Sequence, residues 1–166
     1  MLTHVRRMFS TAPHEIAGLV YGTIVTMGAL AAGSQAEPDP WRLAVAVAAT
    51  VVVLWIAHVY SDALAETIAT GHRLDRAEFV DVARRELSIP LAAVGPVIAL
   101  SLGALGVLRE STAIWVAFGI GLATLFIEGI RYAGVEHLSR PAKVLTVALN
   151  VSLGLAIVAL KVALSH

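Results

Sequence analysis

Long apolar stretches alternate with short polar segments along the whole chain. Five of them are long enough to be membrane spans, over residues 15–33, 42–70, 89–108, 112–132 and 142–164. A helix rises about 1.5 Å per residue, so about 20 apolar residues cross the roughly 30 Å hydrocarbon core of a bilayer. The pattern therefore predicts an all-α integral membrane protein with five transmembrane helices in a single domain, residues 1–166.

A charged segment, residues 71–88, separates the second and third spans. Apolar residues recur in it at helical spacing, with acidic residues and arginines between them. These apolar residues are Leu74, Ala77, Val80, Ala83 and Leu87. Such a pattern is typical of a short amphipathic helix at a membrane surface.

The basic residues are distributed unevenly about these spans. Nine of the twelve Lys and Arg residues fall on one side of a five-span arrangement. These are Arg6, Arg7, Arg73, Arg76, Arg84, Arg85, Arg131, Arg140 and Lys143. Because cytoplasmic loops carry the excess of basic residues, we expect a cytoplasmic N-terminus and amphipathic helix and an outside C-terminus, as a multi-pass protein of the plasma membrane.

Composition narrows the possible functions. Hydrophobic residues make up 58% of the chain and charged residues 14%, against about 25% charged in soluble domains. The absence of cysteine excludes disulfides and thiolate metal sites. There is no basic patch for nucleic acid. There is also no nucleophile–base pair or HExxH motif, so we expect no enzymatic activity.

The first span has a second interpretation. Ala29-Leu30-Ala31 resembles the small-residue cleavage site of a secretory signal peptide. We favour a first span that is retained.

The second span carries a stripe of ionisable residues. His58, Asp62 and Glu66 are spaced i, i+4 and i+8, so they share one face of a helix. An ionisable residue within a membrane helix costs roughly 2.5–3.5 kcal/mol on insertion scales, which makes this stripe a functional-site hypothesis. We expect the other segments to surround this helix.

Two more carboxylates fall at a similar depth, Glu15 at the start of the first span and Glu128 near the end of the fourth. The candidate metal ligands are therefore His58, Asp62, Glu66, Glu128 and Glu15. Nitrogen and oxygen ligands of this kind suit Fe²⁺, Mn²⁺, Zn²⁺ or Co²⁺, and the same groups could relay protons. Two structural alternatives stay open: Glu66 marks where its helix enters water, and Glu128 pairs with Arg131.

Short patches of sequence resemble the vacuolar iron transporter family, which also includes vacuolar manganese importers. The patches are Val20-Tyr21-Gly22-Thr23 with Ile24-Val25-Thr26, Ala31-Ala32-Gly33 and Ser139-Arg140-Pro141, beside the acidic cytoplasmic end of helix two at Asp62 and Glu66. The resemblance implies a homodimer in which helix one of each chain lines the central path. Gly18 and Gly22 would suit that contact.

One family feature is missing. The family's first helix carries Asn-Asp-Gly just after the Tyr-Gly pair, and here Ile24 and Val25 occupy that region.

The sequence therefore supports two functional hypotheses. The first is a transporter of divalent transition-metal cations that could couple to protons, with the ion as substrate and no permanently bound cofactor. The second is a non-transporting structural or regulatory membrane subunit with a transporter-like fold.

Overall fold

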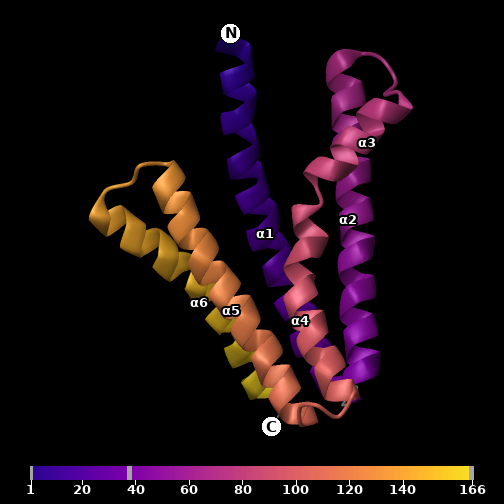
Figure 1. Cartoon of the computed structure of the whole chain (residues 1–166), viewed down its shortest axis with the longest axis vertical. Coiled ribbons are helices and arrows are strands. Elements are labelled where there is room, and N and C mark those ends of the chain that lie inside the picture. Colours follow the sequence, from indigo (N-terminus) through magenta and orange to yellow (C-terminus); the bar gives the residue numbers. More distant parts are fainter. Residues whose placement is uncertain (1, 37–38, 165–166) are drawn as a thin grey trace.

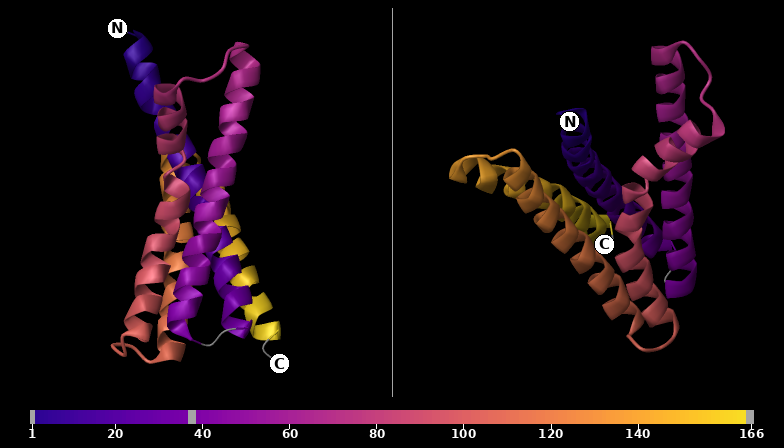
Figure 2. Two further views of the ribbon diagram at one scale, coloured as in Figure 1. Left: turned by 90° about the vertical axis from the view of Figure 1, so that its right-hand side faces the viewer. Right: turned by 45° about the horizontal axis from the view of Figure 1, so that its top comes forward.

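The computed structural model describes the backbone of residues 2–36 and 39–164 and the side chains of residues 14–35 and 39–163. The described residues form six helices: α1 (Leu2–Ala36), α2 (Pro40–Thr70), α3 (Arg76–Arg85), α4 (Ser88–Ala104), α5 (Glu110–Val135) and α6 (Arg140–Leu164). The long helices run alternately up and down, so α1 begins and α6 ends at opposite ends of an elongated bundle (Figures 1 and 2). We call the end where α1 begins and α3 lies the α3 end.

Four helices are long and apolar enough to cross a membrane, or five if α3 and α4 form one bent span. The axes of α3 and α4 meet at 48°. This architecture is compatible with the predicted multi-pass membrane protein. Four of the five predicted spans lie wholly within α1, α2, α5 and α6.

The third predicted span extends to Leu108, four residues beyond the end of α4. Helix α4 ends at Ala104, because Gly106 adopts a left-handed conformation with φ 74° and reverses the chain. The N–H groups of Val107 and Leu108 then donate to the carbonyl of Leu102. With 17 residues α4 is about 25 Å long, shorter than the roughly 30 Å hydrocarbon core.

Helix α1, not α2, is the centre of the bundle. It contacts each of the other helices, with α4 on one side and α5 on the other (Figure 1). Met27 and Leu30 of α1 are fully buried in the main apolar cluster. Thr23 and Thr26 are also buried, and each hydroxyl donates to the carbonyl four residues earlier at 2.7 Å. The expectation that the chain surrounds α2 is therefore wrong.

Glycine allows α1 and α4 to approach closely. A Cβ atom at Gly18 would overlap the Ser88 hydroxyl, and one at Gly22 would overlap the carbonyl oxygen of Ile89. The two glycines that suit a dimer contact are thus used within the chain. The α4–α5 contact is similar, since a Cβ at Gly103 would lie 2.6 Å from that of Ala113.

Two glycines of α1 make a matched test of this packing. Gly22→Ala adds a methyl group against the backbone of α4, which overpacks the contact by roughly 1–3 kcal/mol. Gly28→Ala meets nothing within 4 Å and gains up to about 1 kcal/mol of helix propensity. We expect a lower midpoint of thermal unfolding for Gly22→Ala only, measured by tryptophan fluorescence in detergent. Equal midpoints for the two variants would contradict the α1–α4 contact.

Candidate metal centre

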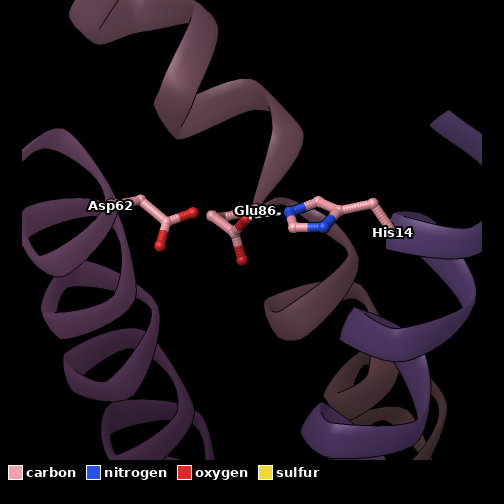
Figure 3. A group of neighbouring side chains, drawn as sticks. All are labelled: His14, Asp62 and Glu86. Carbon is pink, nitrogen blue, oxygen red and sulfur yellow. Dashed lines mark hydrogen bonds and ion pairs between the residues drawn. The ribbon is translucent and has the colours of Figure 1, made fainter. Parts of the chain in front are cut away.

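Three side chains from distant parts of the sequence converge at the α3 end of the bundle. His14 comes from α1, Asp62 from α2 and Glu86 from the break between α3 and α4 (Figure 3). One potential ligand atom of each lies within 4.8 Å of the other two. The Nε2–H of His14 donates to Oε1 of Glu86 at 2.6 Å.

Helix α3 turns Glu86 towards the protein. Its first turn is fixed by a capping box, in which Asp75 and Glu78 each accept the other's backbone N–H at 2.8 Å. Glu86 follows the last residue of the helix, and its side chain is only 6% exposed. Val82, one turn earlier, is buried on the same face. Val82 and Glu86 thus face the protein, whereas Val80 and Leu87 of the predicted apolar face are exposed.

Two side-chain contacts hold α3 against α2. The indole Nε1–H of Trp55 donates to the carbonyl of Ala83 at 3.3 Å. Arg85 donates to the carboxylate of Glu66 at 2.8 Å. On α2 these contacts lie before and after Asp62, so they fix the position of Glu86 relative to Asp62. Glu66, a predicted ligand, is engaged in this ion pair.

The cluster has the chemistry of a divalent-cation site. Two carboxylates and a neutral imidazole carry a charge of −2, and oxygen with nitrogen ligands suits Fe²⁺, Mn²⁺ or Zn²⁺. Ligands bound at about 2.0–2.2 Å lie at most about 4.4 Å apart, so closing around an ion requires a movement of under about 1 Å. For a cation to take both atoms, the Nε2 proton of the neutral imidazole would have to move to Nδ1, which gives the other tautomer.

His58 lies one helical turn from Asp62, farther from the α3 end. Its Nδ1 is 3.2 Å from the carbonyl oxygen of Leu54. Because a carbonyl only accepts, Nδ1 carries the proton and the Nε2 of a neutral ring keeps its lone pair. The ring also packs on Tyr21 of α1, with centroids 4.7 Å apart. His58 and Asp62 of α2 thus each lie close to a side chain of α1, Tyr21 for His58 and His14 for Asp62.

Glu15 and Glu128 lie elsewhere, on either side of Arg131. The buried carboxylate of Glu128 accepts two hydrogen bonds from Arg131, at 2.8 and 3.0 Å. Glu15 lies 3.9 Å from another nitrogen of the same guanidinium. The structure therefore has the ion pair that was the alternative interpretation of Glu128. The five predicted ligands therefore lie in three places. Asp62 belongs to the His14 cluster, and His58 lies one turn from it on α2. Glu66 pairs with Arg85, and Glu15 and Glu128 both contact Arg131.

Sequence reasoning left two members of the cluster, His14 and Glu86, out of the predicted set. A signal for Glu86 was present, because Phe79, Val82 and Glu86 are spaced i, i+3 and i+7 on one face of a helix. His14 and Glu15 are adjacent in the sequence, and nothing in the local pattern indicates which of the two joins the cluster.

Comparisons with protein-family models, with curated proteins and with solved structures found no match for this chain. The resemblance to the vacuolar iron transporter family therefore stays a prediction. The functional argument depends on the geometry of the side chains.

The Arg131 group predicts a specific pattern of stabilities. Arg131→Gln leaves the buried Glu128 carboxylate without its cation and should cost about 2–3 kcal/mol of unfolding free energy. Glu15→Gln removes an exposed, longer contact and should cost at most about 1 kcal/mol. Thermal unfolding of the two single variants and of the double variant Arg131→Gln, Glu128→Gln measures these differences in stability. The double variant should recover stability relative to Arg131→Gln, and a further loss would refute the pairing.

Proposed function

We propose that this chain is a multi-pass protein of the plasma membrane that transports divalent transition-metal cations such as Fe²⁺ or Mn²⁺. The observation that supports it is the convergence of His14, Asp62 and Glu86 from three parts of the chain. Glu86 is buried, whereas His14 and Asp62 are exposed. Such an arrangement gives a hydrated ion access to a ligand inside the protein.

The charge distribution supports a cytoplasmic location of the α3 end. The course of the helices brings nine of the twelve basic residues to that end, in the starts of α1 and α6, the end of α5 and the segment around α3 (Figure 1). The positive-inside rule then places this end in the cytoplasm. An ion would enter the site from that side.

Binding would proceed by exchange of ligands and protons. Asp62 and His14 replace part of the ion's water shell, and Glu86 completes the site as its proton-bridged contact with His14 opens. His58, one turn farther along α2, offers its free Nε2 as the next ligand. Glu66 would need to leave Arg85, and Glu15 and Glu128 would need to leave Arg131, before they join the path.

A homodimer remains part of this proposal. Because α4 occupies Gly18 and Gly22, a second copy would use another face of α1. Ala17 and Ala32 lie towards such a face, and both are exposed. Small residues on an open helix face suit close contact with another membrane helix.

Uptake of metal into proteoliposomes tests the function. We expect uptake of at least one of Fe²⁺, Mn²⁺, Zn²⁺ and Co²⁺, reduced about tenfold or more by Asp62→Asn or Glu86→Gln, because each removes a charged ligand. Asp81→Asn is the control, since Asp81 is exposed on α3 and lies 3.9 Å from Arg84. No uptake of any of the four ions by folded protein would refute transport. Uptake that survives both ligand variants would refute this site.

Acid should weaken metal binding, because protons compete with the cation for imidazole and carboxylate ligands. We expect the dissociation constant for Mn²⁺, measured by calorimetry, to rise roughly tenfold or more from about pH 7.5 to about pH 5.5. In His14→Ala the dependence should be shallower, because imidazole is the type of ligand that protons compete for in this pH range. An affinity that is independent of pH would argue against these ligands.

One observation favours the second hypothesis, a structural or regulatory subunit without transport. Ile24 and Val25, which stand where the family has its acidic motif, pack against apolar clusters of the bundle. Apolar residues at these positions of the first helix contribute to packing of the bundle and provide no ligand for an ion. Purification with a stoichiometric partner, together with absent metal uptake, would support this alternative.

A further inference from the structure

A groove lies between the end of α2 and the turn that leads into α3. Its volume is about 260 Å³, and it is lined by Tyr60, Ala63, Leu64, Thr67, Arg73, Leu74 and Phe79. It is separate from the metal site. Tyr60 and Asp62 are two residues apart, so they point about 200° apart around α2.

The surface around this groove is apolar and uncovered. Tyr60 is 68% exposed, Ile68 74% and Phe79 46%. Val80 of α3 and Leu87, just before α4, are further exposed apolar residues near this end of the bundle. The surface around the groove is also continuous with the exposed apolar face of α2 that faces lipid in the proposed membrane arrangement. A contiguous apolar surface of this kind marks an interaction site.

The length of α2 places the groove at the boundary between lipid and water. Its 31 residues extend about 46 Å, well beyond the roughly 30 Å hydrocarbon core. Trp41 starts α2 at the opposite end, where an interfacial aromatic is expected. About 20 residues later the helix reaches Tyr60, a second interfacial aromatic at the mouth of the groove.

The groove also carries positive charge. Arg73 is part of its lining, and Arg76 begins α3 beside it. Among the side chains that the structure describes, neither arginine forms an ion pair. The nearby acids Asp75 and Glu78 are engaged in the cap of α3. A guanidinium that is free to bind at this depth matches a lipid phosphate in charge and geometry.

We propose that this groove binds an anionic phospholipid, with an acyl chain against Tyr60, Leu64 and Phe79 and the phosphate at Arg73. Helix α3 then lies in the headgroup layer, with Val80 and Leu87 towards the hydrocarbon. The proposal rests on the membrane location proposed above. It does not depend on metal transport, because the groove and the His14 cluster lie on different faces of α2.

Native mass spectrometry of the detergent-purified protein tests it, with phosphatidylglycerol and phosphatidylcholine of identical chains as the probes. We expect about fivefold higher occupancy by phosphatidylglycerol, an effect expected of one arginine near anionic lipid. Arg73→Gln should remove this preference. Leu64→Asn should lower occupancy by both lipids. Arg109→Gln is the control, because Arg109 is an exposed arginine at the opposite end of the bundle.

Equal occupancy by the two lipids, or an equal effect of Arg109→Gln, would overturn the lipid site. A dimer that Leu64→Asn dissociates, without any lipid preference, would make the groove a contact between two copies and would also overturn it. Alkaline carbonate extraction separates the two proposals. Protein released from membranes contradicts the membrane location itself, whereas integral protein without lipid preference contradicts only the groove.

Discussion

The close contact between α1 and α4 fixes the relative positions on which the candidate site depends. Gly18 lies against Ser88, and Gly22 lies against the backbone of Ile89, so the close approach of the two helices in this register depends on both glycines. His14 is one turn before Gly18, and Glu86 is two residues before Ser88. The register therefore brings the imidazole to the carboxylate. Larger residues at these glycines would separate the helices and the two ligands together.

Among the residues that the structure describes, Glu86 and Glu128 are buried carboxylates at the α3 end, and their partners differ. A buried carboxylate needs a compensating partner, because it has lost its water. Glu128 has a permanent cation, Arg131, in a two-bond contact. Glu86 has an imidazole and, through Asp62, a second negative group nearby. The first arrangement is complete without an ion, whereas the second would gain stability from the divalent cation that we propose. This difference is why we place the metal at Glu86.

Much of the helical arrangement could be predicted from the sequence, because apolar length and turn residues act locally. Residues 42–70 were predicted as one helix, and Gly71 ends it with a left-handed φ of 72°. The end of α4 was missed because Gly106 reverses the chain inside an apolar run. Partners across helices could not be predicted. The two residues that meet Asp62 lie 48 residues before it and 24 after it, and the partner of Glu66 is Arg85 at the end of α3.

Pulsed electron paramagnetic resonance of bound Mn²⁺ tests the central claim most directly, because it detects nitrogen coordinated to the ion. The His14–Asp62–Glu86 site predicts a directly coordinated nitrogen whose signal disappears in His14→Ala and persists in His58→Ala. A bound ion without coordinated nitrogen, or a signal that is lost in His58→Ala but not in His14→Ala, would contradict it.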